Sequence, residues 1–225
     1  MLVLGVSFGY HDSAAALINN GRIIAAIQEE RFSRKKNDSS FPINAIEFCL
    51  KAGGTLINDL DAIIYYEQPL LKFDRILRSA LFRFPIKWSY LVETIRNWFE
   101  AEKFDPLQLI ANRCEVKRPI IKAIHHHQSH AASTFFCSPF EESLIVTLDG
   151  VGEHEVGSVS IGKNNNIEKL LSINFPHSLG LVYSAFTSFL GFEVNEGEYK
   201  VMGMSSFGKP HFKDKILDLF KLTAD

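Results

Sequence analysis

Four of the eight histidines in this chain lie within six consecutive positions, at His125, His126, His127 and His130. Neutral imidazole is a ligand for iron, zinc and similar ions. On a helix, side chains four residues apart lie on one face, so His126 and His130 can bind one metal ion together. His127 and His130, three residues apart, fit almost as well, and spacing alone does not choose between the two pairs. The alternative is a solvated, mildly basic start of a helix.

Two imidazoles need a carboxylate to complete a metal site, and Asp149 is the natural candidate. It follows the apolar segment SLIVTL, which predicts a buried strand. Asp149 can join a pair of these histidines if the N-terminus of the histidine helix and the end of the strand meet at one cleft. That condition on the tertiary structure decides whether a metal centre forms.

Two glycine-containing turns, SFGYHDSA and TLDGVGEHE, each follow a predicted buried strand. Glycine in such a turn lets backbone N–H groups point at an anion and form a phosphate nest. Asp12 and Asp149 would repel phosphate directly, so they act through a cation or on a donor hydroxyl. Two such turns in equivalent places, the second containing Gly150, predict a nucleotide cleft between them. The alternative is two ordinary turns that lead into hairpins.

His11 and Asp12 form a second candidate pair in the first turn. A histidine beside a phosphate loop can accept a proton from a substrate hydroxyl, because its pKa lies close to the working pH. The alternative is a turn histidine capped by Asp12 or Ser13.

Two further cations are candidate phosphate clamps. Lys36 belongs to the basic segment EERFSRKK, and Lys200 lies between Gly197 and Gly203 in GEYKVMG. Cations near a cleft can bind phosphates, whereas the same residues on a free loop are simply solvated.

The elements that must position these residues follow a repeated plan. LVLGVSFG predicts a strand and a glycine turn, and SAAALI-NNG-RIIAAIQ predicts a hairpin because Asn20-Gly21 suits a tight turn. SLIVTLDGVGE and VGSVSIG-NNN-IEKLLSI repeat this order. We therefore expect two lobes, residues 1–142 with the first phosphate loop and the histidine helix, and residues 143–225 as the start of a second lobe.

Helices are predicted between these strands. Pro42 begins one through Leu50, which Gly53 and Gly54 end, and LGLVYSAFTSFLGF predicts another. Residues 70–101 have helical periodicity, divided in two by Pro85. We expect EERFSRKKNDSS and EGEYKVMGMSSFGKP to be loops and the last residues to form a polar helix.

Composition narrows the class of protein. The formal net charge is −2, which implies no nucleic-acid partner, and 46% hydrophobic with 22% charged residues is a globular balance. Three scattered cysteines without a C-x-x-C motif fit a reducing cytoplasm. The N-terminus lacks the pattern of a signal peptide, and charges interrupt the best candidate membrane span, so we expect no membrane association.

Six segments of the chain together carry a resemblance to a known family. They are VSFGYHDSAAALI, EERFSRKK, HHHQSHAAS, VTLDGVGE, SLGLVYSAFTSFLGF and GEYKVMGM. In order and spacing they resemble the O-carbamoyltransferases of nodulation-factor and aminoglycoside biosynthesis. More distantly, they are similar to tRNA threonylcarbamoyl-transfer enzymes and hydrogenase-maturation carbamoyltransferases. The resemblance implies an α/β fold of the actin-like ATPase class, with two lobes of mixed sheets flanked by helices.

The resemblance also implies a reaction and roles for residues. Carbamoyl phosphate and ATP form carbamoyl adenylate, and a hydroxyl group of a small-molecule acceptor takes the carbamoyl group. His126, His130 and Asp149 fall on the family's ligands for iron(II), or another divalent metal, which holds the nucleotide phosphate. His11 falls on the proposed base for the acceptor hydroxyl, and Lys36 on a lysine that contacts the intermediate.

Other positions fall on the nucleotide side of the family's site. They are Asp12, Gly150, Gly180, Lys200 and Gly203, which we expect to contact ATP or carbamoyl adenylate.

The resemblance covers only part of the family's length. Family members carry a further aspartate ligand, the rest of the second lobe and a C-terminal domain that makes carbamoyl adenylate. We therefore expect an N-terminal portion with an incomplete second lobe, whose exposed apolar surface needs a partner: a separate C-terminal chain or another copy. Two alternatives stay open, a non-catalytic nucleotide- or metal-binding module acting with a partner chain, and a sugar-kinase-like phosphotransferase.

Overall fold

Two β-sheets form the framework of the protein. The computed structural model describes residues 1–81, 92, 93, 95, 96, 98, 105–218 and 220. In these ranges the strands are β1 (Leu2–Ser7), β2 (Ala14–Asn19), β3 (Arg22–Gln28), β4 (Ala62–Tyr65), β5 (Ile120–Ala123), β6 (Glu142–Leu148), β7 (Glu155–Lys163) and β8 (Asn166–Asn174). The helices are α1 (Glu30–Ser33), α2 (Ile43–Gly53), α3 (Pro69–Leu81), α5 (Pro106–Arg113), α6 (His126–Phe135), α7 (Leu179–Phe189), α8 (Glu198–Ser205) and α9 (Lys213–Leu217), with a 3-10 turn at Ile57–Asp59.

The first sheet has the strand order β3-β2-β1-β4-β5. The first three strands are antiparallel neighbours, and β4 and β5 are added parallel to β1. The turn between β2 and β3 contains Asn20 and Gly21, both with positive φ, as the predicted hairpin requires. Because β1, β4 and β5 are parallel, their carboxyl ends lie at one edge of the sheet, where α/β proteins place their sites.

The main core lies between this sheet and the helices that cover it. Leu4, Leu17 and Ile63 are fully buried in it, and α2 packs on β2 and β3 with Ala45, Ile46 and Cys49. The predicted helix after Pro42 is confirmed, and it ends at Gly54, which has a φ of 60°. Burial of these side chains stabilises the first sheet, and so it fixes the position of the edge at which strands β1, β4 and β5 end.

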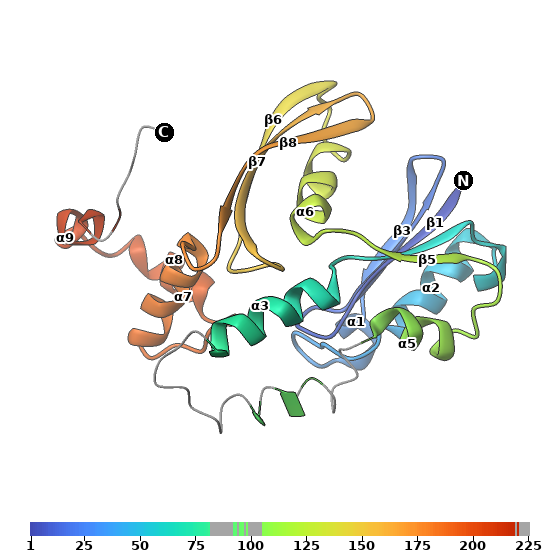
Figure 1. Cartoon of the computed structure of the whole chain (residues 1–225), viewed down its shortest axis with the longest axis horizontal. Helices are drawn as coiled ribbons and strands as arrows, with labels where there is room; N and C mark the ends of the chain where they lie inside the picture. The colour runs from blue at the N-terminus through green and yellow to red at the C-terminus, as the bar shows by residue number, and fades with distance from the viewer. Residues whose placement is uncertain (82–91, 94, 97, 99–104, 219, 221–225) are drawn as a thin grey trace.

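The second sheet has the order β6-β7-β8, with antiparallel neighbours throughout. One face of β6 is covered by α6, where Ile145 packs with Ala131 and Phe135. The opposite face is open: Leu144, Val146 and Leu148 are 64%, 57% and 63% exposed. Side chains alternate across a strand, so this open face forms one continuous apolar stripe along β6. Figure 1 shows α6 on the side of this sheet that faces the first sheet.

The two sheets begin in the same way, as the sequence predicted. Each opens with a strand, a glycine turn and an antiparallel hairpin, and this α/β architecture agrees with the actin-like class. The two sheets differ in the neighbours of their first strand. Strand β1 pairs with β2 on one side and with β4 on the other, whereas β6 pairs with β7 and has no second neighbour among the described residues. Placing the lobe boundary at residue 142 stays a prediction. In the structure, α6 packs against the second sheet, although it precedes that boundary in the chain.

Two predicted loops contain helices, and those predictions were wrong. Glu30–Ser33 forms the short helix α1, which Arg34 ends with a φ of 60°. Glu198–Ser205 forms α8 despite Gly203, because one glycine inside a helix costs only about 1 kcal/mol relative to alanine. The side chain of Glu198 also accepts a hydrogen bond from the backbone N–H of Asn195 at the start of that helix.

The remaining helix predictions are confirmed where they can be compared. Helices α3, α6, α7 and α9 lie in the expected segments. The proposed division at Pro85 lies outside the described residues. Within the described ranges, no helix combines the length and apolarity that crossing a bilayer requires.

Candidate metal centre

Three nitrogen and oxygen atoms converge where α6 begins and β6 ends. His126 Nε2 lies 3.0 Å from Asp149 Oδ2 and 3.0 Å from His130 Nε2. One ligand atom from each of the three residues lies within 4.8 Å of the others. The condition set by the sequence is therefore met, since the N-terminus of the histidine helix and the end of β6 meet at this point.

The donor set fits a divalent metal ion. A single proton on His126 Nε2 can form a good hydrogen bond to only one of its two neighbours, whereas a metal cation between the three atoms can bind all three. Two imidazole nitrogens and one carboxylate oxygen suit iron, zinc and similar ions. Three protein ligands also leave coordination positions free for other groups.

The charges of the site favour the metal-binding protonation states. Burial raises the pKa of Asp149, but the hydrogen bond and charge of His126 and the N–H of Gly150 outweigh it and bring the pKa to about 2. Burial, with the positive charge of a protonated His126, lowers the pKa of His130, although Asp149 partly opposes this. The site therefore favours an ionised Asp149 and a neutral His130, as metal ligation requires of both residues.

The N-terminus of α6 is held by a buried carboxylate. Glu153, only 4% exposed, accepts hydrogen bonds from the backbone N–H of His126 at 2.9 and 3.2 Å and from that of Gln68 at 2.8 Å. A carboxylate at a helix N-terminus satisfies N–H groups that lack partners in the helix. Glu153 lies four residues after Asp149. The β6–β7 turn therefore supplies both a candidate metal ligand and the carboxylate that holds the N-terminus of α6.

The main chain around Asp149 is held from the other side by the start of α7. The hydroxyl of Ser178 lies 3.0 Å from the carbonyl oxygen of Asp149 and 2.6 Å from that of Gly150, and it accepts the N–H of Leu181. Gly180 packs so closely that an added Cβ would lie 2.7 Å from the Asp149 carbonyl oxygen. Gly180 is thus required by close approach, and Gly150 donates its N–H to Asp149 Oδ1 at 2.7 Å.

His127 points away from the other two histidines. It is 2% exposed, and its Nδ1 lies 2.7 Å from the hydroxyl of Thr147, which in turn lies 2.7 Å from that of Ser158. These two hydroxyls belong to β6 and β7, so His127 fixes α6 to the second sheet. The alternative pair of His127 and His130 is therefore not the pair that the structure brings together.

The first glycine turn lies at the end of β1. His11 Nδ1 lies 2.8 Å from Asp12 Oδ2, and both side chains are partly exposed. Gly9 and Asp12 have positive φ values of 92° and 49°. The N–H of Gly9 donates to the Ser39 carbonyl, so this donor is already used within the protein. A phosphate nest in this turn stays a prediction that depends on the other N–H groups.

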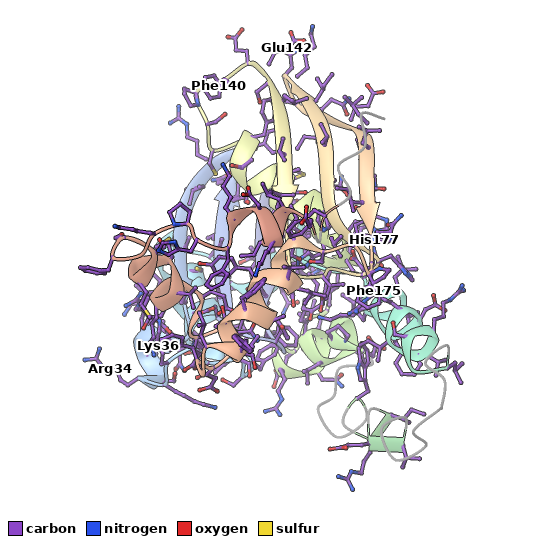
Figure 2. The ribbon with its side chains drawn as sticks, turned by 90° about the vertical axis from the view of Figure 1, so that its left-hand side faces the viewer. Arg34, Lys36, Phe140, Glu142, Phe175 and His177 are labelled. Atoms are coloured by element: carbon purple, nitrogen blue, oxygen red, sulfur yellow. The ribbon has the colours of Figure 1, made fainter. Side chains whose placement is uncertain are left out.

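The predicted cations lie on neighbouring surface segments. The side chain of Lys36 is 77% exposed, and its Nζ lies 3.6 Å from Glu30 Oε2. Figure 2 shows Lys36 near Arg34 on the outside of the segment after β3. A hydrogen bond of 2.9 Å from Asn37 to Glu196 joins this segment to the loop before α8. That helix carries Lys200 and Gly203, both exposed, and the structure shows no contact from either to the three candidate ligands among the described residues.

Sequence reasoning missed Glu153 and Ser178. It also missed Glu67, whose Oε2 lies 3.9 Å from His126 Nδ1, and Lys72, which forms an ion pair with Glu67. Glu67 follows the parallel strand β4, so its place at the edge where β1 and β5 also end was a usable signal. Ser178 comes directly before an apolar helical segment, which is the usual place for a capping residue. Glu153 carries no such local signal, because its partners lie 27 and 85 residues away in sequence.

Comparison with known proteins identifies the class to which this fold and site belong. A family model described as carbamoyltransferase N-terminus matches residues 2–224. The chain therefore belongs to the family of carbamoyltransferase N-terminal regions.

Two relatives illustrate the similarity. The chain is 44% identical, over 99% of its length, to an uncharacterized protein of Synechocystis sp.. It is 33% identical, over 89% of its length, to the nodulation protein NolNO of Sinorhizobium fredii. The matches span 37% and 28% of these two relatives, so the chain corresponds to about a third of their lengths.

Similar solved structures are much more distant. They include YeaZ from Pseudomonas aeruginosa, with a TM-score of 0.37 and 12% identity over 78% of this chain and 69% of that one. Component A of (R)-2-hydroxyglutaryl-CoA dehydratase from Acidaminococcus fermentans has a TM-score of 0.42 and 12% identity over 100% of this chain and 81% of that one.

Proposed function

We propose that this chain is the N-terminal part of an O-carbamoyltransferase that moves a carbamoyl group from carbamoyl adenylate to a hydroxyl of a small-molecule acceptor. The observation that supports it most is the convergence of His126, His130 and Asp149 at 3.0 Å in a chain of the carbamoyltransferase family. A divalent metal, iron(II) by the family resemblance, would be held by these three side chains. Bound there, it supplies positive charge that stabilises the phosphate of the departing AMP.

His11 is the proposed base for the acceptor. With its Nδ1 hydrogen-bonded to Asp12, the ring presents Nε2 as a proton acceptor to an incoming hydroxyl. The hydroxyl proton passes to His11 Nε2 as the acceptor oxygen bonds to the carbamoyl carbon, and the bond from that carbon to the adenylate phosphate oxygen breaks. Asp12 thus orients the base, and AMP leaves with the electron pair.

The other predicted residues serve the nucleotide in this proposal. Lys36 binds the phosphate of the intermediate, and Lys200 and Gly203 on α8 border the nucleotide. The N–H of Gly150 holds the carboxylate of Asp149, and Gly180 packs against the main chain of Asp149. ATP, carbamoyl phosphate and the acceptor are the small-molecule partners. The portion that makes carbamoyl adenylate comes from the rest of a longer protein or a separate chain.

A complementation assay tests this function. The purified chain is incubated with ATP, radiolabelled carbamoyl phosphate, iron(II) and a panel of aminoglycosides and Nod-factor-like sugars. One set of samples also contains the part of the Synechocystis relative that follows its matched region. We expect labelled acceptor only in that set, and loss of label with His11→Ala. Phosphorylated acceptor without carbamoyl phosphate would instead indicate the sugar-kinase-like reaction.

A second candidate function is a non-catalytic metal- or nucleotide-binding module that acts through a partner. The open apolar face at Leu144, Val146 and Leu148 favours it, because exposed stripes of this kind mark interaction surfaces. Metal binding without carbamoyl transfer in any set of the assay would support this module.

A further inference from the structure

The ring of His126 has one nitrogen that the candidate metal centre does not use. Its Nε2 faces Asp149 and His130, whereas its Nδ1 is buried and has no hydrogen-bond partner among the described residues. When Nε2 binds a metal, the proton of the neutral ring must lie on Nδ1. A buried N–H without an acceptor is costly, so the site requires an acceptor on this side of the ring.

Glu67 is the carboxylate that faces this nitrogen. Its Oε2 lies 3.9 Å from His126 Nδ1, longer than a hydrogen bond but within reach of a small side-chain rotation. Glu67 is only 6% exposed, and both of its oxygens accept hydrogen bonds of 2.8 Å from Lys72 Nζ. A buried ion pair is costly to desolvate, so its place beside the unpartnered nitrogen calls for an explanation beyond stability.

We infer that Glu67 is a positioning residue of the metal centre, whose carboxylate accepts a hydrogen bond from the Nδ1–H of His126 and so directs Nε2 toward the metal, while Lys72 holds Glu67 in place. This inference rests on the metal centre in the proposed function. Carboxylates that accept the second ring proton of a metal-bound histidine fix its tautomer and orientation, and their loss costs about 10- to 100-fold in metal affinity.

Lys72 also connects this arrangement to the first glycine turn. Its Nζ lies 5.2 Å from the centre of the Tyr10 ring, and that ring lies 4.7 Å from the ring of His11. Glu67 and Lys72 therefore lie between the candidate base and the candidate metal centre.

The experiment measures cobalt(II) binding by the complete chain, with the visible absorption spectrum as the readout of ligand geometry. We expect Glu67→Gln to weaken cobalt binding about 10- to 100-fold and to change the spectrum. Because Glu67→Gln leaves Lys72 buried without its partner, the double variant Glu67→Gln/Lys72→Met is measured too. It should restore the urea midpoint but not the affinity or the spectrum, whereas Lys72→Met alone should weaken cobalt binding less than Glu67→Gln, because it leaves the carboxylate beside His126 in place.

A matched control is Glu29→Gln, which alters a carboxylate that is 2% exposed and accepts the N–H of Ala45, away from the metal centre. It should lower stability and leave cobalt affinity and spectrum unchanged. Wild-type affinity and spectrum in the double variant would overturn the role of Glu67, provided that His126→Ala abolishes binding. If the wild-type chain binds no cobalt at all, the metal centre itself is wrong, and the role of Glu67 falls with it.

Discussion

The Nε2 atoms of His126 and His130 lie 3.0 Å apart on adjacent turns of α6, and Asp149 Oδ2 lies 3.0 Å from the first of them. Two imidazoles on one helix face would separate freely if nothing held their rings. Here the ring of His126 is fixed by its contact with Asp149 at the end of β6, and the ring of His130 packs edge-on against it. The chain therefore presents a preorganised group of three donors, which lowers the cost of binding a cation.

Replacing any one ligand should abolish stoichiometric metal binding. His126→Ala, His130→Ala and Asp149→Asn each remove one of three donors, and the remaining two cannot hold the ion against dilution. Metal analysis after gel filtration, with cobalt(II) titration, measures the loss. His125→Ala is the control, because this exposed neighbour should keep the metal content of the wild type. Retention of metal in both histidine variants would exclude the proposed ligands.

The metal-free protein should lose stability on acidification in two stages. Since the pKa of His130 is lowered, below its ordinary value of 6.5 the unfolded chain binds a proton that the folded chain resists, and stability falls. Asp149 adds a second loss between its ordinary pKa of 3.8 and its folded value of about 2, worth about 2 kcal/mol. Urea unfolding in chelator at several pH values measures both. Asp149→Asn should lack the second stage, and an unchanged acid profile in that variant would contradict this assignment.

Glu153 should contribute strongly to stability. Glu153→Gln exchanges charged for neutral acceptors at the N–H groups of His126 and Gln68, so we expect a loss of about 1 to 3 kcal/mol. Equilibrium urea denaturation measures this loss. In the same turn region, Glu155→Gln alters only a partly exposed ion pair with Lys169 and should cost less than about 1 kcal/mol. Equal losses in the two variants would show that Glu153 has no special capping role.

Two glycines predicted to lie near the nucleotide should differ in how their replacement by alanine affects metal affinity. Gly180→Ala places a Cβ 2.7 Å from the Asp149 carbonyl oxygen, so it should displace that turn, cost about 1 to 3 kcal/mol and weaken metal binding. At Gly203 nothing lies within 4 Å of an added Cβ, so Gly203→Ala should leave metal affinity intact. Cobalt titration and thermal unfolding distinguish the two. Wild-type metal affinity in Gly180→Ala would mean that the turn can move without affecting Asp149.

The apolar stripe on β6 should make the chain self-associate. We expect its apparent mass, measured by light scattering, to rise with concentration, and the double variant Leu144→Lys/Leu148→Lys to stay monomeric. Stability should change by less than about 0.5 kcal/mol per site, because both side chains are largely exposed. Leu56→Lys, which alters an equally exposed residue before the 3-10 turn, should leave association unchanged. A monomeric wild-type chain at every concentration would show that the stripe does not drive association.

Much of the fold could be predicted, because its signals are local. The apolar segment of β6, the Asn20-Gly21 turn and the Pro42 helix start all depend on neighbouring residues, although β6 is buried on one face only and not on both as predicted. The loop predictions for Glu30–Ser33 and Glu198–Ser205 failed because neither a high charge nor a single glycine excludes a helix of one or two turns. Of the candidate site, the helix periodicity gave two possible histidine pairs, and burial of His127 against Thr147 decides between them. That burial depends on the packing of α6 against the second sheet, which no local pattern specifies.

The groups that support the site could not be predicted in the same way. Glu67, Lys72 and Glu153 are ordinary charged residues in the sequence, and they become notable only through burial. Their contacts join segments far apart in the chain, such as Gln68 and Glu153. Predicting them requires the parallel order of β1, β4 and β5, which brings their ends to one edge.

The close approach of Gly180 to the main chain of Asp149 has a mechanical consequence. Helix α7 begins at this contact and leads through a short loop to α8, so the C-terminal helices are linked to a candidate metal ligand at this point. Any rotation of α7 relative to β6 is either blocked by the contact between Gly180 and Asp149 or displaces the carboxylate of Asp149 as well. A rearrangement of α7 and α8 would therefore change the position of Asp149 and, with it, the affinity of the site for the cation.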